Sequence, residues 1–572
     1  MSEIGAVADY FSEIEDLEER SEITTDAEGK VISYRDSDGV KHEEVGINSS
    51  VVNTNSLNLT AQGMTEFQRA LKDSGFTSGA GDWSDNESLE IPMPRCAIVN
   101  ITNDTNNAIW PISKTADYHY YLQFWDMQGN YFKKPVIYNA QGNSSMGMPK
   151  KNAGFDMFAD TWDGEAFTLK IGGWVPQDSF HLKAYYADYF VGVCPIGYKL
   201  FNQIIGTRDI FTNRDWKKAL LPSKTNIGTG CRAMDGEDDK YSLDNDARCF
   251  PDGFPCIVYL NGEFYGVFSW QLKKHRDNYM MSKKKTKHIH LDGVIDNATL
   301  FGANGDSSLI AWVDTADNGF EIRNPKPKKK KDGWDLTCID ETTYDADTNM
   351  KEIIGQDDPL YDPENTSHVK TNETKQAILT LSTYIPELQQ MENDGATTEQ
   401  IRTRLSEMFD IQSFVDYLVF GDVIGNFDGF RKNWQWITYN GTKWFIEPYD
   451  LDGIFGWSGW GEISPSSGRY GNNLELPSGW IIKYFTEELE SRYSELRSLE
   501  IFKTDNILSI FRSWIEAIGV DNYQLNHDKW PNDREHYYAA PVDTHYDNIY
   551  RVSNWLDVRI AKCDEIYNYN QN

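Results

Sequence analysis

The chain has 572 residues, of which 40% are hydrophobic and 13% aromatic, so it carries enough apolar material for two or three folded domains and is not intrinsically disordered. Its formal net charge of −33 excludes a nucleic-acid-binding surface spread over the whole molecule. The seven cysteines are odd in number and lack the paired spacing of metal ligands, which favours reduced thiols over a disulfide framework.

The N-terminal sequence has no basic segment followed by a long apolar core, so we expect no signal peptide. No stretch approaches the roughly 18 consecutive apolar residues of a membrane span. The expected location is the cytoplasm, or a virus particle if the protein is encoded by a phage.

Residues 1–90 are predicted to form an accessory module followed by a linker. An acidic and apolar pattern at 8–20 indicates a short amphipathic helix, and two strand-like pieces at 29–35 and 40–45 are joined through an Asp-Gly turn pair. The remainder of this part is rich in Asn, Ser, Thr and Gly, which is typical of a linker.

A β-rich core is expected from about Pro92, with strands at 96–101, 118–125 and 131–138. The last of these leads into Gly142-Asn143-Ser144-Ser145 and then Lys150 and Lys151. A glycine followed by small hydroxyl residues can form a nest of backbone N–H groups for an anion, and nearby lysines can pair with phosphate oxygens. The alternative is a turn with solvated lysines. Strand alternation allows only one of the two lysines to face a given side.

Further elements follow in order along the chain. We expect a hairpin of 254–260 and 263–270 with a type I′ turn at Asn-Gly, and a helix at 187–205. A helix from 372 to 391 is expected to be kinked or split by Pro386, and Thr397 opens another with a capping box. Residues 300–370 look like an irregular insertion, and the lysine runs 283–287 and 326–331 are expected in solvated loops.

The stretch from Gly425 to Gly456 carries the main candidate site. An amphipathic helix at 411–424, with Asp410 as N-cap, places Asp428 on the loop at its end. A hairpin then follows, with strands at 434–439 and 443–447. A two-residue type I′ turn at Asn440-Gly441 would put Asn433 opposite Pro448, with Asp450 and Asp452 just beyond it.

Three carboxylates and one amide oxygen at one place form the hard-oxygen donor set that Mg²⁺ or Mn²⁺ prefers. The order Asp428, Asn433, then Asp450 or Asp452 is also the functional order of a kinase site. One alternative is a solvated acidic loop. A calcium loop fits poorly, because Gly453 comes three residues after Asp450, whereas an EF-hand places its glycine about five residues after the first Asp.

The C-terminal part is predicted to be mainly helical, at 482–518 and 541–568. Before it, the aromatic and glycine-rich segment around Trp457 and Trp460 is expected to form a lip or a substrate-facing loop.

The Gly425–Gly456 stretch resembles the signature of the CotH kinase family, a group of atypical protein kinases. The matching positions are Asn426, Asp428, Asn433, Pro448, Asp450, Asp452, Phe455 and Gly456. Four further segments are similar to family elements in the same order, so that the resemblance spans about 92–530. They are G-N-S-S with P-K-K, His181–Asp188, Y-L-N-G-E-F-Y-G-V-F and Arg492–Arg497.

The resemblance implies an α+β, two-lobed, atypical protein-kinase-like fold with a β-rich N-lobe and a helical C-lobe. The expected division is 1–90 as the small β-containing accessory module, 91–480 as the kinase domain and 481–572 as a C-terminal helical part packed on it. The implied activity is ATP-dependent phosphoryl transfer to protein Ser or Thr hydroxyls with Mg²⁺ or Mn²⁺. The implied site has Asp428 as proton acceptor, Asn433, Asp450 and Asp452 as metal ligands, and ATP phosphates near Gly142, Asn143, Ser144, Ser145 and Lys150 or Lys151.

The chain departs from the family pattern at two places. Gly429 and Phe430 stand where the family has Arg-His, and the Gln271–Leu272 region lacks the acid that usually follows the second hairpin. These departures support an alternative, a structural virion or appendage protein that retains the fold with little or no catalysis. A sugar-binding module built on the aromatic segment is a third hypothesis. The expected partners are a protein substrate or other virion proteins, with no nucleic acid.

Overall fold

The structure is a computed structural model. It describes residues 88–126, 130–142, 144–207, 251–274, 276–279, 287–292, 300–301, 372–430, 433–458, 461–531 and 545–570, together with the backbone of short strands before residue 44 and between 321 and 335. The helix predicted at 8–20, the linker, most of the 300–370 insertion and most of the lysine run 283–287 lie outside these residues. The prediction of a loop for the lysine run 326–331 is wrong at its centre, because β15 (Lys328–Lys330) pairs antiparallel with β16 (Gly333–Asp335). Near the N-terminus, β2 (Val31–Arg35) pairs antiparallel with β3 (Lys41–Glu43), which confirms the two strands predicted there.

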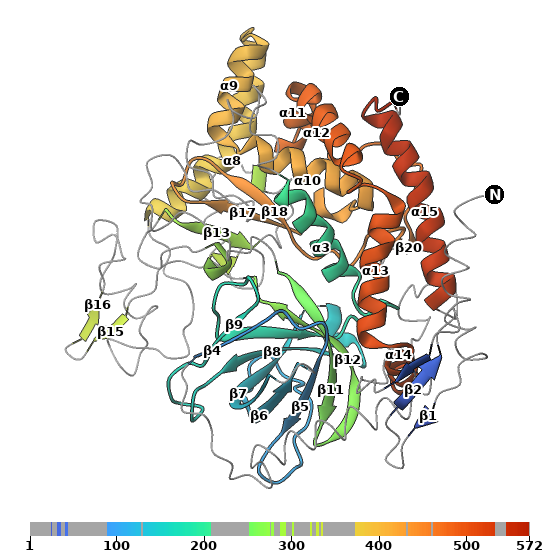
Figure 1. The fold of residues 1–572 in the computed structure, drawn as a ribbon. Helices are drawn as coiled ribbons and strands as arrows, with labels where there is room; N and C mark the ends of the chain where they lie inside the picture. The colour runs from blue at the N-terminus through green and yellow to red at the C-terminus, as the bar shows by residue number, and fades with distance from the viewer. Residues whose placement is uncertain are drawn as a thin grey trace.

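A closed β-barrel forms the lower half of the molecule in Figure 1. Its strands follow the order β10-β12-β11-β5-β6-β7-β8, and all neighbours are antiparallel except β5 and β11. The predicted strands at 96–101, 118–125 and 131–138 are confirmed as β5, β6 and β7. The bounds are β5 Ala97–Thr102, β6 Tyr118–Trp125, β7 Tyr131–Gln141, β8 Asn152–Met157, β10 Ser179–Lys183, β11 Gly253–Leu260 and β12 Glu263–Leu272, with β4 Ser88–Ile91 and β9 Thr168–Ile171 paired beside them.

The hairpin predicted between β11 and β12 is confirmed. Leu260 pairs with Glu263, which leaves Asn261 and Gly262 as a two-residue turn with φ of 55° and 82°, as a type I′ turn requires. Inside the barrel the aromatic rings of Phe124, Phe155 and Trp270 pack edge to face, with centroids 4.9–5.4 Å apart. This core is separate from that of the helices.

The helices pack together above the barrel in Figure 1, and α3 lies between the two parts. The chain is therefore a mixed α+β protein. The helices are α3 Val193–Gly206, α8 Asn372–Asn393, α9 Thr398–Met408, α10 Ile411–Ile424, α11 Pro477–Tyr484, α12 Thr486–Ser498, α13 Thr504–Ile518, α14 Val520–Lys529 and α15 His545–Ile566. In the part of the chain that is described, no helix combines the length and apolarity needed to cross a membrane.

Most helix predictions are confirmed, with corrections at their ends. Thr397 caps α9 with both bonds of the capping box, and Asp410 caps α10 by accepting the Ser413 N–H. Pro386 lies within α8 without dividing it. The region predicted to be helical at 482–518 is confirmed as helical and is divided among α11, α12 and α13.

The helix predicted at 187–205 starts later, at Val193. Before it, the Asp188 carboxylate accepts the backbone N–H groups of Phe190, Gly192 and Val193 at 2.7–2.8 Å, which fixes a non-helical turn. This local bonding of an Asp side chain to the backbone competes with helix formation.

A four-stranded sheet of order β14-β13-β17-β18 lies below α10, where β13 is Ile289–Asp292, β14 Glu321–Ile322, β17 Trp434–Thr438 and β18 Phe445–Pro448. The type I′ turn predicted at Asn440-Gly441 is wrong, because Trp434 pairs with Pro448 and the register differs by one residue. The backbone of Trp444 pairs with the chain before α10, through bonds with Met408 and Asp410. A longer loop therefore closes the hairpin, with Asn440 Oδ1 accepting the Thr442 and Lys443 N–H groups.

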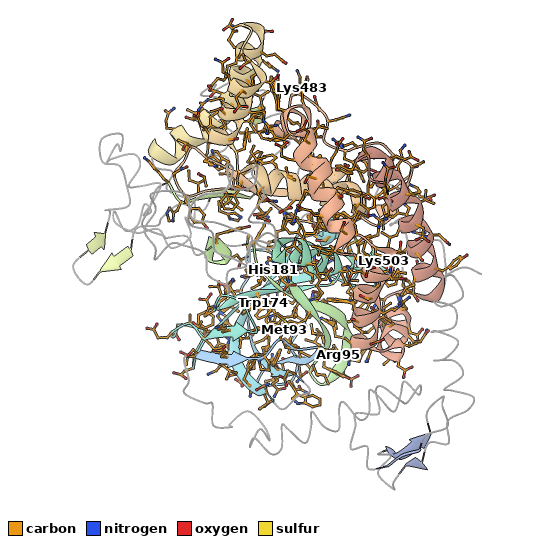
Figure 2. The ribbon with its side chains drawn as sticks, turned by 45° about the horizontal axis from the view of Figure 1, so that its top comes forward. Met93, Arg95, Trp174, His181, Lys483 and Lys503 are labelled. Carbon is orange, nitrogen blue, oxygen red and sulfur yellow. The ribbon has the colours of Figure 1, made fainter. Side chains whose placement is uncertain are left out.

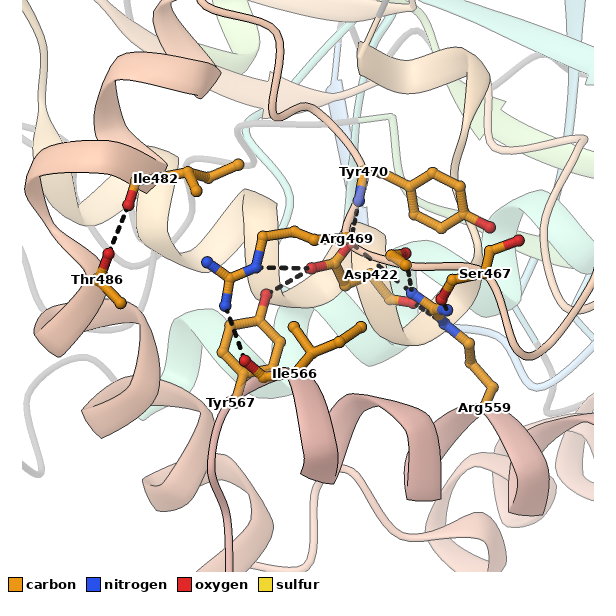
Figure 3. Close-up of polar contacts among 10 residues, drawn as sticks. Asp422, Ser467, Arg469, Tyr470, Ile482, Thr486, Arg559, Ile566 and Tyr567 are labelled. Atoms are coloured by element: carbon orange, nitrogen blue, oxygen red, sulfur yellow. Dashed lines mark hydrogen bonds and ion pairs between the residues drawn. The ribbon is translucent and has the colours of Figure 1, made fainter.

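A buried polar cluster fastens α10 to α15 and to the loop before α11 (Figure 3). Asp422 accepts the Tyr470 N–H and the Tyr567 hydroxyl, both at 2.7 Å, and the guanidinium of Arg469 lies 3.8 Å away. Arg559 donates to the Asp422 carbonyl at 2.5 Å and to carbonyls of Pro465, Ser467 and Gly468. Asp422 and Arg559 are both fully buried, so this cluster is dry and compensated.

Candidate active site

The acidic loop begins where α10 ends. Gly425 adopts the left-handed conformation (φ 74°) that ends the helix, and the Asn426 amide oxygen then accepts the Gly429 N–H at 3.1 Å. Tyr417 of α10 donates its hydroxyl to the Gly429 carbonyl at 2.9 Å. These bonds shape the short turn Asp428–Phe430 and place Asp428 at its start.

The first departure from the family pattern is built into this turn. A Cβ atom on Gly429 would lie 2.1 Å from Asn426 Nδ2 and 2.5 Å from the Tyr417 hydroxyl, so any side chain at this position needs its neighbours to move. Phe430 is buried against the rings of Tyr417 and Tyr470. Both replacements are thus accommodated by packing under the loop.

Asn433 and Asp428 are brought together. The Asn433 Nδ2 donates to Asp428 Oδ2 at 2.7 Å, and the Asn433 carbonyl accepts the Tyr449 N–H at 3.2 Å. Asn433 is therefore next to the segment that carries Asp450, although the predicted hairpin register was wrong. Asn433, Asp450 and Phe455 all have positive φ, at 66°, 53° and 54°, and such strained backbone is concentrated at functional sites.

The acids interact with one another and with a lysine of the barrel. Crowding by surrounding protein, and then the negative charges of Asp450 and Asp428, raise the pKa of Asp452 well above its usual value, while Lys183 opposes the rise. The Asp452 side chain is nonetheless exposed to solvent. Removal from water lowers the pKa of Lys183, and the charges of Asp450 and Asp452 act in the opposite direction.

Lys183 connects the acidic loop with the predicted phosphate loop. Its Nζ donates to Gln141 Oε1 at 2.7 Å, and Gln141 immediately precedes Gly142, which has a φ of 115°. Ser145 accepts a bond from the Asn152 amide at 3.1 Å, and Asn152 Oδ1 accepts the Ala184 N–H at 2.7 Å. The loop is therefore tied to Lys183 directly and, through Asn152, to Ala184. Asn143, and the side chain of Ser144, lie outside the described residues.

The two lysines predicted from sequence lie elsewhere. Lys150 is fully buried, and its ammonium donates to the Ala184 and Val267 carbonyls and to Asn526 Oδ1. Because an ammonium has three N–H donors, this set saturates it. Lys151 donates to the carbonyls of Met146 and Met148 at 2.9 and 2.7 Å, which follow the predicted phosphate loop in the chain.

A small recess separates the barrel from the acidic loop. It is lined from the barrel side by His181, Lys183, Gln271 and Lys274 and from the other side by Tyr449 and Asp450. Lys274 lies over the Tyr449 ring, 4.5 Å from its centroid. In Figure 2, His181 marks the end of the barrel nearest the helices, whereas Lys483 marks the far end of the helical part.

The residues present fit a hard divalent cation. In the described residues, no three His, Cys, Asp or Glu side chains converge closely enough to hold an ion by themselves. The Asn433 amide nitrogen is committed to Asp428, which leaves its oxygen to act as a ligand beside Asp450 and Asp452. One or two carboxylates completed by phosphate oxygens and water is the usual way to bind Mg²⁺.

Sequence reasoning missed Lys183. Its signal was available, because it ends a strand inside the segment His181–Asp188 that resembles the family. At the second departure from the family pattern, Gln271 and Leu272 are the last two residues of β12; Gln271 is buried and lines the recess, and Leu272 faces the barrel core.

The fold and the site define a mixed α+β protein in which an oxygen-rich loop faces a lysine-bearing β-barrel. A family model described as CotH kinase protein matches residues 249–559, which is more than half of the chain, and the protein therefore belongs to the CotH kinase family. Membership supports a kinase-like function and implies the use of ATP with a divalent metal ion. The match begins after the predicted phosphate loop. No curated protein matches the chain.

Proposed function

We propose that this protein is a CotH-type kinase that transfers the terminal phosphoryl group of ATP to a Ser or Thr hydroxyl of a protein. The supporting observation is the position of Lys183, which hydrogen-bonds Gln141 at the predicted phosphate loop and interacts electrostatically with Asp450 and Asp452. Phosphoryl transfer depends mainly on positioning and on charge stabilisation, and this arrangement supplies both.

In the proposed two-lobed arrangement, the barrel is the nucleotide-binding lobe. The loop Gly142–Ser145 and Lys183 would hold the phosphates, in place of the Lys150 and Lys151 expected from sequence. Lys274, at the same recess, is the second cation available to the phosphates.

Asn433, Asp450 and Asp452 would hold Mg²⁺ or Mn²⁺, which would neutralise phosphate charge. Asp428 would accept the proton of the substrate hydroxyl. Its hydrogen bond from Asn433 fixes the orientation of the carboxylate for that role.

Thermal melting with ATP and Mn²⁺ tests the binding part of this proposal. A ligand present at about 100 times its Kd should stabilise the fold by about 2.7 kcal/mol. The Lys183→Met variant should lose most of the shift, whereas wild-type protein with Mn²⁺ alone controls for the metal.

Incubation with labelled ATP and candidate co-expressed proteins, followed by mapping of the labelled residues, tests transfer. Labelled Ser or Thr that disappears with Asp428→Asn is the expected result. A protein that shows neither a nucleotide-dependent shift nor transfer would support the alternative, a structural virion or appendage protein with a kinase-like fold.

A further inference from the structure

We infer that α3 is the platform that sets the position of the acidic loop, with Gly197 and Tyr198 as positioning residues for Asp450 and Asp452. The inference rests on the proposed function, in which these two acids bind the metal ion. Gly197 and Tyr198 act on the metal site through the backbone and the apolar side chains of the loop.

The hydroxyl of Tyr198 holds the backbone of the first acid. It accepts the Asp450 N–H at 3.2 Å, and the Tyr198 side chain is almost fully buried in the core of the helical part. Asp450 has a φ of 53°, a conformation that costs a non-glycine residue free energy unless its surroundings impose it. The hydrogen bond between this amide and a buried helix is one such constraint.

Gly197, the preceding residue of α3, lets the loop approach the helix closely. A Cβ atom on Gly197 would lie 2.9 Å from the Cδ1 atoms of both Leu451 and Ile454. These two side chains are buried, and in a close-packed interior they have little room to turn aside. Leu451 joins Asp450 to Asp452 in the chain, so displacing it disturbs both acids.

The backbone of Gly197 does not itself call for glycine. It lies inside α3 and has no positive φ, and a glycine inside a helix weakens that helix. The close approach of the acidic loop is therefore the physical reason for a glycine at this position.

α3 is fixed at both ends, as a platform must be. At its start the Asp188 carboxylate accepts two backbone N–H groups. At its end the Arg492 guanidinium donates to the Ile204 carbonyl at 3.0 Å and to the Thr207 hydroxyl at 2.8 Å. The same buried guanidinium donates to Asp416 of α10 at 2.7 Å, which ties α3 to the helix from which the acidic loop begins.

α3 also follows in the chain from the strand that carries Lys183. β10 ends at Lys183, and the next residue, Ala184, is held on both sides of its backbone. Its carbonyl accepts a bond from Lys150 at 3.2 Å, and its N–H donates to Asn152 at 2.7 Å. One segment therefore carries the proposed phosphate-binding lysine at its start and the contacts to the acidic loop in its helix.

Hydrogen–deuterium exchange of the ligand-free full chain, resolved at the Asp450 amide by fragmentation mass spectrometry, tests the inference. Tyr198→Phe should raise the exchange rate about fivefold, the factor expected for one lost hydrogen bond. Gly197→Ala should raise it as well, because the displaced loop loses the geometry of that bond. Gly206→Ala is the matched control in the same helix, since a Cβ atom there would meet nothing within 4 Å, and it should keep the wild-type rate.

The same variants should separate metal binding from stability. The apparent affinity for Mn²⁺–ATP should fall about 10–100-fold in Tyr198→Phe and Gly197→Ala, the range found when groups that orient metal ligands are lost. It should be unchanged in Gly206→Ala. The melting temperature of Tyr198→Phe should stay close to that of the wild type, because the ring remains in the core.

Wild-type exchange at Asp450 in Tyr198→Phe, or equal exchange in Gly197→Ala and Gly206→Ala, would overturn the inference. Tyr198→Phe deletes only one hydroxyl, so it decides the question if Gly197→Ala does not fold. Because exchange is measured without ligand, its outcome is independent of the proposed function. If exchange responds as expected but the wild-type protein binds no Mn²⁺–ATP, the kinase proposal fails and the positioning of the loop by α3 stands.

Discussion

The buried Asp422 of α10 and the carboxylates of the acidic loop that follows it differ in how their negative charge is offset. Asp422 is dry, and although burial raises its pKa, bonds from Tyr470 and Tyr567 and the charges of Arg469 and Arg559 oppose that rise. The acidic loop is in contact with water, and Asp450 and Asp428 add to the negative charge felt by Asp452, with Lys183 as its compensating cation. The charge of Asp422 is offset within the protein, whereas the acidic loop has negative charge that a bound cation can offset.

The difference separates structural from functional acids. A buried carboxylate surrounded by donors holds helices and loops together, and removing its charged partner leaves a buried charge uncompensated. An acid held by backbone strain in a wet recess does not stabilise the fold, and its position is explained by what it binds. Removing a charged group should therefore destabilise the fold at the Asp422 cluster and should not do so in the acidic loop.

The largest expected effect is on transfer. Asp428→Asn should reduce phosphoryl transfer by about 10²–10⁴-fold, because the base that accepts the hydroxyl proton is lost. The rate of labelled phosphate incorporation measures it. Asp163→Asn, an exposed acid on a barrel loop, is the control and should transfer normally. Undiminished transfer by the Asp428→Asn variant would show that Asp428 is not the base that accepts the hydroxyl proton.

The dry cluster is tested by Arg559→Met. Loss of this guanidinium leaves Asp422 and three loop carbonyls without their donor, and the free energy of unfolding should fall by about 3–5 kcal/mol. Denaturant unfolding gives the value. Lys562→Met on the same helix removes an exposed ion pair with Glu565 and should cost less than about 1 kcal/mol.

The acidic loop should behave in the opposite way. Asp452→Asn removes charge repulsion, so the ligand-free protein should melt at the same temperature as the wild type or higher. The same variant should lose the stabilisation by Mn²⁺ and ATP. A clear loss of stability without ligand would show that this acid is structural, like Asp422.

Lys183, which is half-buried, and Lys150, which is buried, offer a matched pair. Lys183→Met should abolish the nucleotide-dependent melting shift and leave the ligand-free melting temperature nearly unchanged. Lys150→Met should do the reverse, because Lys150 ties the barrel to α14 through Asn526. A nucleotide shift lost only in Lys150→Met would restore the assignment made from sequence.

The last prediction concerns pH dependence. Burial lowers the pKa of Lys150 from 10.5 to about 7, so the folded state binds fewer protons than the unfolded state between these values. Stability should therefore rise with pH from about 7 towards 10. Comparing wild type with Lys150→Met in urea at pH 7 and pH 9 isolates this contribution, and a difference that is constant with pH would contradict it.

Sequence patterns predicted elements whose signals are local. The caps at Thr397 and Asp410, and the hairpin at Asn261-Gly262, follow from neighbouring residues. The same Asn-Gly pair at 440–441 misled, because the backbone of Trp444 bonds to a segment more than 30 residues away. The proximity of Asn433 and Asp450 in the acidic loop was also predictable, because only a short hairpin separates them in the chain.

Local spacing does not favour Lys183 over Lys150 and Lys151, although its place in the segment His181–Asp188 that resembles the family marked it as a candidate. Which lysine faces the acids depends on the closure of the barrel and on the packing of α14, both of which join distant parts of the chain. Spacing near the phosphate loop carries no information on either.

The Gly429 turn has a consequence for the history of this chain. Because Asn426 and Tyr417 occupy the space that a side chain at 429 would need, replacing Gly429 with the family arginine would create a clash under the loop. These two buried side chains would have to move to admit it. The glycine is therefore entrenched by its neighbours, and variation at these positions in related chains should be correlated.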